Sequence, residues 1–323
     1  MATAEQLKSL IRSYFSDDLE RFTTVVLQVA AHEAQQGHGA LAHEIREIVE
    51  KARRERGHVK LLKFPQDLRG LVLSEEPSIT NSSLVLPDAL KSRINRIVHE
   101  YRQQQKLKSH GLSNRRKILL VGPPGTGKTM TAQALAHELR LKLLTIQVDK
   151  LVTKFMGETS AKLRQIFDLI REEQGVYLFD EFDAIGGERS LDNDVGEMRR
   201  VLNAFLQFIE HDVSDSLIVA ATNSPKLLDH ALFRRFDDVL YYDIPDHEAR
   251  KHLIQNVLGS FLPPLFPWKK VGRESEGLSH AEIDYACRDA IKQAILGDMS
   301  TVNSDLLSQM LAEKQSNRSR KQR

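Results

Sequence analysis

The chain has 323 residues, of which 28% are charged and 41% hydrophobic, and its formal net charge is +2. This composition is that of an ordinary globular protein, and so small a net charge gives no overall field that would favour nucleic acid or a membrane surface as a partner. The one cysteine, Cys287, excludes a disulfide framework within the chain, and no apolar run is long enough to predict a membrane-spanning helix.

Residues 1–57 are expected to form a small unit of three helices. Apolar side chains recur at helical spacing from Leu7 to Phe15 and again from Phe22 to Ala30. Gly37-His38-Gly39 would end the second helix, and Leu41 opens the apolar face of a third. A unit of this size is typical of an adaptor or substrate-docking domain, and the alternative is an extension of the main domain. The first residues lack a secretory pattern, so we expect a cytoplasmic protein.

Residues 58–86 contain Pro65, Gly70 and Pro77, which predict a linker with short extended pieces. A helix is expected to follow from Asp88 to Lys108. Residues 87–245 then have the pattern of an α/β domain, because predicted strands and helices alternate, and this alternation predicts a parallel sheet. The expected strands are at 117–121, 143–148, 176–180, 216–221 and 238–243.

A Gly-rich segment follows the first of these strands. Its sequence is Gly122-Pro123-Pro124-Gly125-Thr126-Gly127-Lys128-Thr129, which fits G-x-x-x-x-G-K-[ST], the phosphate-binding P-loop. A predicted helix continues from Met130, and strand, loop and helix together are the context that the motif requires. Backbone N–H groups and a helix N-terminus attract phosphate. We therefore expect residues 122–130 to bind a nucleotide, with Lys128 at the β- and γ-phosphates and Thr129 at Mg²⁺.

Two carboxylates end the strand Val176-Tyr177-Leu178-Phe179. If this strand lies beside the P-loop strand, Asp180 reaches the Mg²⁺ shell and Glu181 faces the water that attacks the γ-phosphate. A surface turn rich in acids is the alternative, but four apolar residues directly precede the pair. The sequence therefore favours a hydrolytic site with divided roles for Asp180 and Glu181.

Two further polar groups follow in the chain. Asn223 ends the strand that begins at Leu217, and it either sits in a turn before Pro225 or orients the attacking water. Its place in a series of strands with polar ends favours the second interpretation. Arg234 and Arg235 are either a solvated helix end or arginine fingers, which stabilise charge on the γ-phosphate.

Residues 246–312 are predicted to be helical again, after a break at Pro245 and with a proline-rich interruption. We interpret Cys287, on an apolar helical face, as a buried packing residue. The tail, residues 313–323, is expected to be disordered and solvated, and a nucleic-acid contact is the less favoured interpretation. Its last ten residues include five basic ones: Lys314, Arg318, Arg320, Lys321 and Arg323.

These motifs, in this order and at this spacing, resemble an AAA+ ATPase of the AAA subfamily over residues from about 85 to 312. The resemblance implies an α/β nucleotide-binding core with a parallel sheet, a C-terminal helical lid and Mg²⁺-dependent ATP hydrolysis. It also implies a ring, usually a hexamer, with ATP bound between subunits. In this family Lys128 and Thr129 would be the Walker A pair, Asp180 and Glu181 the Walker B pair, and Asn223 would be sensor 1.

The resemblance extends to the arginine pair, the pore and the lid. Arg234 and Arg235 resemble fingers donated in trans, and residues 277–283 resemble the lid segment that closes over the nucleotide. Lys154, Phe155 and Met156 resemble the first pore loop of protein-remodelling members, whose apolar side chains grip an unfolded chain; the alternative is that Phe155 and Met156 pack in the core. Residues 186–193 are the candidate for a second pore loop.

The chain departs from the family pattern at several positions. Phe155 stands where Tyr or Trp is more usual, and His280 stands where many relatives have glycine. The two arginines are adjacent, as in microtubule-severing and related members, which leaves open whether Arg234 or Arg235 is dominant. The lid has no obvious sensor 2 arginine.

We therefore expect an ATPase whose ring remodels, unfolds or threads protein substrates through a central pore. A separate protease or adaptor is a candidate partner, and no membrane partner is expected. The alternative hypothesis is a nucleotide-gated assembly switch, or a nucleic-acid-associated ATPase that uses the basic tail. Stimulation by nucleic acid with a steep salt dependence would favour the alternative, whereas stimulation by unfolded polypeptide would favour remodelling.

Overall fold

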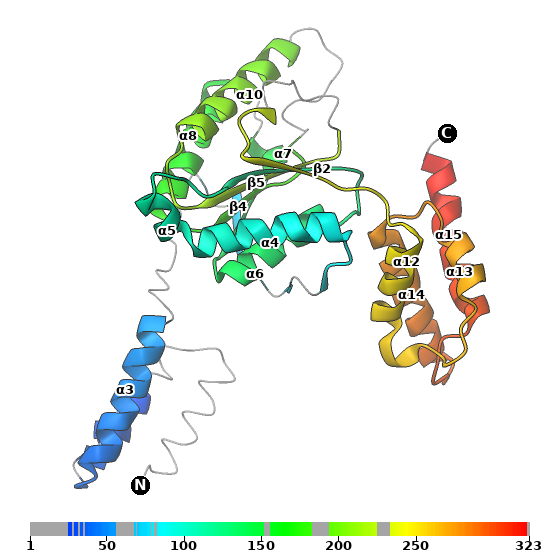
Figure 1. Cartoon of the computed structure of the whole chain (residues 1–323), viewed down its shortest axis with the longest axis horizontal. Helices are drawn as coiled ribbons and strands as arrows, with labels where there is room; N and C mark the ends of the chain where they lie inside the picture. Colours follow the sequence, from blue (N-terminus) through cyan, green and yellow to red (C-terminus); the bar gives the residue numbers. More distant parts are fainter. Residues whose placement is uncertain are drawn as a thin grey trace. The chain divides into compact units, whose positions relative to one another are not determined.

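This computed structural model describes residues 25–27, 29–31, 33–34, 36–55, 68, 70–77, 79–80, 83–151, 156–182, 194–224 and 233–321. The chain divides into two units, Met1–Pro65 and Gln66–Arg323 (Figure 1). In the first unit, helix α3 spans Gly39–Glu55 and so begins close to the predicted third helix. Most of the two helices predicted before it lie outside the described residues.

The second unit is built on a six-stranded sheet with the order β1-β3-β4-β5-β2-β6. Strand β1 pairs antiparallel with β3, and the remaining pairs are parallel. The α/β class with a mostly parallel sheet, predicted from the sequence, is confirmed. The strands are β1 (Val72–Glu75), β2 (Lys117–Val121), β3 (Leu143–Ile146), β4 (Val176–Phe179), β5 (Leu217–Thr222) and β6 (Asp238–Tyr241).

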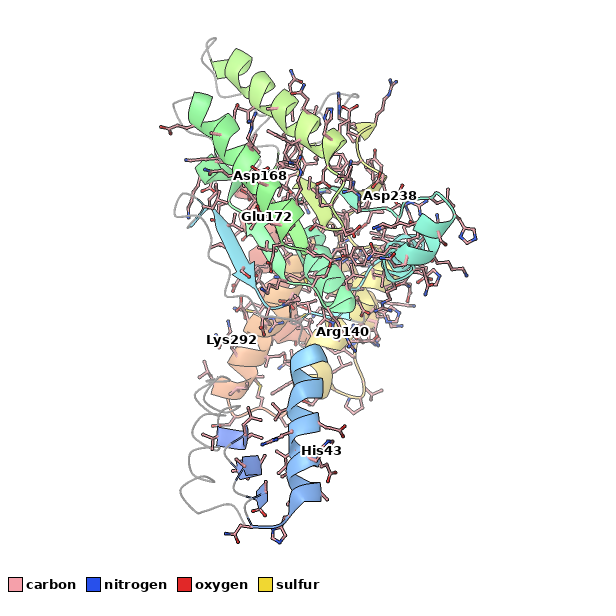
Figure 2. All side chains as sticks on the ribbon, turned by 90° about the vertical axis from the view of Figure 1, so that its left-hand side faces the viewer. His43, Arg140, Asp168, Glu172, Asp238 and Lys292 are labelled. Atoms are coloured by element: carbon pink, nitrogen blue, oxygen red, sulfur yellow. The ribbon has the colours of Figure 1, made fainter. Side chains whose placement is uncertain are left out.

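Helices cover both faces of this sheet, as a parallel sheet requires. Figure 1 shows α4 (Asp88–Arg102) and α6 (Lys128–Leu139) on one face, and α8 (Met156–Glu172) and α10 (Asp194–His211) on the other. The polar side chains of Asp168 and Glu172 project from the outer surface of α8 (Figure 2). The shorter helices of this region are α5 (Gln104–Ser109) and α7 (Val148–Leu151).

In the central strand β4, successive side chains point alternately to the two faces of the sheet. Val176 and Leu178 pack into the core on the α4 and α6 side. Tyr177 and Phe179 point to the other face, where the Tyr177 hydroxyl donates to the Leu169 carbonyl at 3.1 Å and Phe179 packs edge-on against Phe205 with ring centroids 4.9 Å apart. Because both faces are buried, the polar residues after Phe179 emerge at the carboxyl edge of the sheet.

The remaining helices form the C-terminal helical region around their own core, in which Cys287 is fully buried as predicted. Helix α12 begins after Asp246, whose carboxylate accepts from the Ala249 N–H at 2.8 Å. Ser279 and Glu282 form a reciprocal capping box at the start of α14. The elements are α12 (His247–Leu258), η4 (Gly259–Phe261), α13 (Trp268–Glu274), α14 (His280–Leu296) and α15 (Ser304–Lys321).

The structure differs from the sequence prediction in three places. The expected linker, 58–86, supplies strand β1 and the core residues Leu84 and Leu86. The helix expected from Asp88 to Lys108 is divided at Gln103 into α4 and α5. Finally, the tail expected to be disordered continues α15 to Lys321.

Contacts with the rest of the helical region explain why the tail is helical. The Lys314 ammonium lies 3.0 Å from the Asp289 carboxylate, and the Gln315 side chain donates to the Glu274 carbonyl at 2.7 Å. These two contacts attach the start of residues 313–323 to the helical region, although the composition of this segment alone predicts a solvated, disordered tail. No helix in the described part of the chain has the length and hydropathy needed to cross a membrane.

Candidate functional site

The P-loop connects β2 to α6, and its shape depends on close main-chain packing at Gly122. A Cβ atom at this position would lie 2.2 Å from the carbonyl oxygen of Tyr242. The Tyr242 N–H donates to the Val121 carbonyl at 2.7 Å, and its buried hydroxyl donates to Thr131 at 2.8 Å. Tyr242 therefore fixes both ends of the loop, a role that nothing in the local sequence pattern indicates.

The second half of the loop adopts the left-handed conformation that glycine favours. The φ angles are +74° at Gly125 and +98° at Gly127, and Gly127 directly precedes α6. The Thr126 hydroxyl donates to the Pro123 carbonyl at 2.8 Å and so closes the turn. These conformations bring the loop amides and the α6 N-terminus to the carboxyl edge of the sheet, where they favour a polyanion.

Lys128 is almost completely buried, with 6% of its surface exposed. Its ammonium group donates to the carbonyls of Gly122 at 2.7 Å and Pro123 at 2.8 Å, and to the Asn223 amide oxygen at 2.7 Å. The lysine therefore joins the P-loop to the end of β5. A lysine ammonium group at this position can donate charge-assisted hydrogen bonds to phosphate oxygens.

Thr129 and the end of β4 form the second junction. The Thr129 hydroxyl donates to the Asp180 carboxylate at 2.7 Å. A hydroxyl and a carboxylate oxygen side by side belong to the hard oxygen ligands that Mg²⁺ prefers. The fold thus brings Thr129 and Asp180 together, the two residues predicted to share Mg²⁺, and it also joins Asn223 to Lys128, a contact that the sequence did not predict.

Glu181 has an unusual main-chain conformation, with φ at 51°. Its N–H donates to the Asp180 carboxylate at 2.9 Å, and its side chain is exposed. Left-handed conformations at residues other than glycine cost free energy and gather at functional sites. The chain therefore turns at Glu181 and leaves the direction of β4, while Asp180 keeps its hydrogen bond with Thr129.

The arginine pair lies at the start of the segment that leads into β6. The side chain of Arg234 is exposed, and the Arg235 guanidinium lies 3.0 Å from the Glu210 carboxylate at the end of α10. Residues 225–232, which connect Asn223 to this pair, lie outside the described ranges.

The pore-loop predictions fall largely outside the described residues. Lys154 and Phe155 are not described, nor are residues 186–193, and of Met156 only its position at the start of α8 is described. The predicted nucleotide contact Met130, by contrast, lies in the first turn of α6 with 40% of its surface exposed.

The segment predicted to form part of the lid, residues 277–283, contacts the P-loop directly. The Ala281 N–H donates to the Gly125 carbonyl at 3.0 Å, and a Cβ atom at Gly125 would lie 2.8 Å from the Ser279 hydroxyl. His280 lies between these two contact residues, and burial lowers its pKa. The sequence resemblance pointed to this segment, but not to its contact with Gly125.

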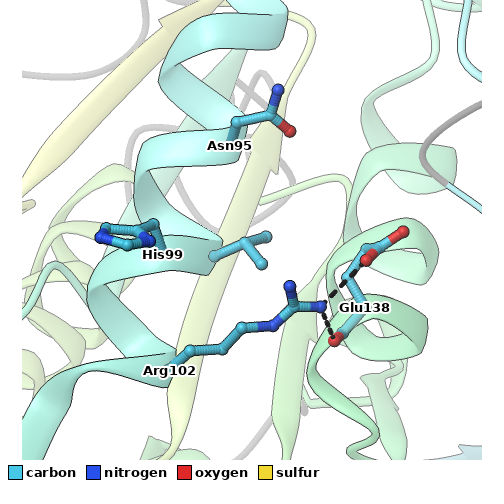
Figure 3. Close-up of a pocket in the computed structure, with 5 residues that line it drawn as sticks. Asn95, His99, Arg102 and Glu138 are labelled. Atoms are coloured by element: carbon cyan, nitrogen blue, oxygen red, sulfur yellow. Dashed lines mark hydrogen bonds and ion pairs between the residues drawn. The ribbon is translucent and has the colours of Figure 1, made fainter.

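A pocket of about 350 Å³ lies between α4 and α6, away from this site (Figure 3). Arg102 crosses it and donates to the Glu138 carbonyl at 2.7 Å and carboxylate at 3.1 Å. Glu138 lies ten residues after Lys128 on α6, which corresponds to about 15 Å along the helix axis. This pocket therefore does not belong to the P-loop site. It is lined by Asn95, Val98, His99, Arg102 and Glu138.

Comparison with known proteins gives a consistent result. Residues 118–244 match the family described as ATPase family associated with various cellular activities (AAA). An uncharacterized AAA family ATPase, y4kL of Sinorhizobium fredii, is 33% identical over 308 residues, which cover 92% of this chain and 90% of that protein.

Two more distant matches extend this result. The proteasome-activating nucleotidase of Methanopyrus kandleri is 31% identical over 258 residues, which cover 76% of this chain but 59% of that protein. The crystal structure of the FIGL-1 AAA domain has the same fold, with a TM-score of 0.62 at 22% identity, over 79% of this chain and 91% of that one.

Proposed function

The chain belongs to the AAA family of ATPases, and from this premise we propose that it forms a ring that couples ATP hydrolysis to the remodelling of protein substrates. The proposal rests first on one observation: two hydrogen bonds join the P-loop to the ends of two neighbouring strands. Lys128 reaches Asn223 at 2.7 Å, and Thr129 reaches Asp180 at 2.7 Å. Residues of the kinds that phosphoryl transfer needs therefore lie at one sheet edge, which supports the proposal.

Each group at this edge has a proposed role toward ATP. The loop amides of residues 122–127 hold the phosphates, and the Lys128 ammonium exchanges its carbonyl partners for β- and γ-phosphate oxygens. Met130 contributes an exposed apolar surface in the first turn of α6. Thr129 and Asp180 would hold Mg²⁺, which would supply charge stabilisation on the phosphate oxygens.

Hydrolysis requires a group that activates water and groups that stabilise the developing charge. Glu181, directed outward by its left-handed main chain, accepts the proton of the attacking water, and Asn223 orients that water. Arg234 and Arg235 would reach the γ-phosphate bound to a neighbouring subunit, an effect worth roughly 10³–10⁵ in rate. Arg235 and its partner Glu210 precede β6 and β5, so they lie at the amino edge of the sheet, away from the P-loop at the carboxyl edge, which supports a role toward the nucleotide of a neighbouring subunit.

Protein substrates are proposed from the sequence of the pore loop and from one relative. Lys154, Phe155 and Met156 would present apolar side chains to a central channel, and residues 186–193 would form a second loop. The name of the Methanopyrus relative, proteasome-activating nucleotidase, associates that protein with the proteasome. A separate protease or an adaptor is therefore a candidate partner here, and residues 1–57 are the proposed docking domain.

A trapping experiment tests this proposal. Glu181→Gln should bind ATP and retain it, since the P-loop is intact, while turnover falls by at least about a hundredfold. The variant is purified with ATP from its native cells, and bound material is identified by mass spectrometry and nucleic-acid staining. We expect co-purifying polypeptides, and we expect Glu181→Gln/Phe155→Ala to lose them while ATP stays bound.

The controls separate the two hypotheses. Lys128→Ala should lose both nucleotide and polypeptides. Co-purifying nucleic acid, or a chain that carries neither, would contradict protein remodelling and favour the nucleotide-gated switch or nucleic-acid-associated ATPase. Retained turnover by Glu181→Gln would remove Glu181 from the role of base.

A further inference from the structure

The carboxylate of Asp237 is bound to the main chain at the start of β2. One of its oxygens accepts hydrogen bonds from the N–H groups of Arg116 and Lys117, both at 2.9 Å. In return, the Asp237 N–H donates to the Lys117 carbonyl at 2.8 Å. Hydrogen bonds to a carboxylate are stronger than those between neutral groups. Asp237, two residues after Arg235, therefore ties the segment of the arginine pair to the strand that leads into the P-loop.

Two other contacts hold the same short segment. Phe236, which stands between Arg235 and Asp237, is buried, with 7% of its surface exposed. The Arg235 guanidinium lies 3.0 Å from the Glu210 carboxylate, but both of these side chains are partly exposed, and such ion pairs restrain a side chain only weakly. The bonds of Asp237 differ from this ion pair because their donors are main-chain groups of the sheet. Asp237 therefore determines where the segment lies relative to β2.

The position of the segment gives these bonds a consequence for catalysis. Strand β6 begins at Asp238 and runs parallel to β2, so the arginine pair lies beside the start of β2 and the P-loop lies beyond its end. The five residues of β2 correspond to about 17 Å. The placement of a catalytic group matters greatly, because a displacement of about 1 Å can cost about a hundredfold in rate.

We infer that Asp237 is a positioning residue for Arg234 and Arg235: it fixes their segment on β2 and so presents the pair to the nucleotide of a neighbouring subunit. This inference rests on the proposed function, in which the pair acts in trans. Because Asp237 lies at the far end of β2 from Lys128 and Thr129, its loss should leave ATP binding in its own subunit intact. The defect should appear where this subunit donates its arginines.

Measurements on single variants of the full chain separate positioning from a general structural role. Asp237→Ala should bind ATP at equilibrium with an affinity within about twofold of the unmodified chain, while kcat for ATP hydrolysis falls about a hundredfold. Asp237→Asn keeps an acceptor oxygen, so its kcat should fall by less than about tenfold. Asp215→Ala is the matched control and should keep the full rate, because Asp215 is a carboxylate just before β5 that pairs with the Lys108 side chain.

Mixed rings identify the site that Asp237 serves. In an equal mixture of Asp237→Ala with Lys128→Ala, about a quarter of the interfaces combine an intact P-loop with a correctly placed arginine pair, so hydrolysis should recover toward this fraction of the unmodified rate. An equal mixture of Asp237→Ala with Arg235→Ala should stay inactive, because no subunit in it can donate a working pair.

Each other outcome has a definite meaning. If Asp237→Ala recovers with Arg235→Ala but not with Lys128→Ala, Asp237 serves the site of its own subunit and the inference is wrong. Recovery with neither partner, a loss of ATP affinity or an unchanged kcat would also overturn it. Should Asp237→Ala not fold, Asp237→Ser, whose hydroxyl reaches less far than the carboxylate, takes its place in the same mixtures. If Lys128→Ala and Arg235→Ala fail to restore each other, the proposed action in trans is contradicted, and the inference falls with it.

Discussion

At the scale of single residues, the main chain of Glu181 is the most informative feature. Its φ of 51° costs about 1–2 kcal/mol for a residue with a Cβ atom. A helix or strand position would not require this conformation, so the strain is a consequence of turning Glu181 away from Asp180. Because the turn at Glu181 keeps this unfavourable conformation, we infer that the direction of the Glu181 side chain is needed for function at the expense of local stability.

This strain predicts an inverted order of stability for two variants that both lack the carboxylate. Glu181→Gly should be more stable than Glu181→Ala by about 1 kcal/mol, because glycine adopts the left-handed conformation without strain. At most positions the order is the reverse, since glycine has the more flexible unfolded state. Urea denaturation of the two variants measures the difference, and an alanine variant of equal or greater stability would contradict the strain at this residue.

At the scale of elements, the strongest constraint is the contact of the P-loop with the residue that follows β6. Gly122→Ala would place a Cβ atom 2.2 Å from the Tyr242 carbonyl, and neither main chain can move without breaking the β2–β6 pairing. We expect a loss of about 2–3 kcal/mol in the free energy of unfolding and a large loss of nucleotide affinity.

Gly127→Ala is the matched control for this prediction. A Cβ atom there meets nothing within 4 Å, although φ is +98°. Its cost should therefore be confined to backbone strain, and thermal unfolding should show a smaller loss than for Gly122→Ala. Equal losses in the two variants would mean that the contact with Tyr242 contributes nothing beyond the backbone conformation.

The elements also show how far a sequence predicts this fold. The five parallel strands, and the polar residues Asp180 and Asn223 at the ends of two of them, follow from local patterns, because apolar runs and the polar residues after them are contiguous in the chain. Strand β1 has only four residues, and its position depends on antiparallel pairing with β3, which lies about 70 residues later. The contacts of Tyr242 with Gly122 and of Lys314 with Asp289 are equally non-local, so no local pattern indicates them.

At the scale of the whole molecule, the open question is whether each active site takes its arginine from a neighbour. The Arg235 guanidinium pairs with Glu210, whereas Lys128 pairs with Asn223. If the finger acts in trans, Lys128→Ala and Arg235→Ala damage different halves of a shared site. Each variant alone should then be inactive, because every interface lacks one half.

Mixing the two inactive variants distinguishes the alternatives. In a random ring made from equal amounts, about a quarter of the interfaces combine an intact P-loop with an intact arginine, so ATP hydrolysis should recover toward this fraction of the wild-type rate. If the arginine serves its own subunit, every site keeps one defect and no activity returns. A further mixture of Lys128→Ala with the double variant Lys128→Ala/Arg235→Ala is the control, since it contains no intact P-loop and should stay inactive. Recovery in the first mixture and not in the second would establish a shared interface as the catalytic unit, because only a neighbour can supply the missing group.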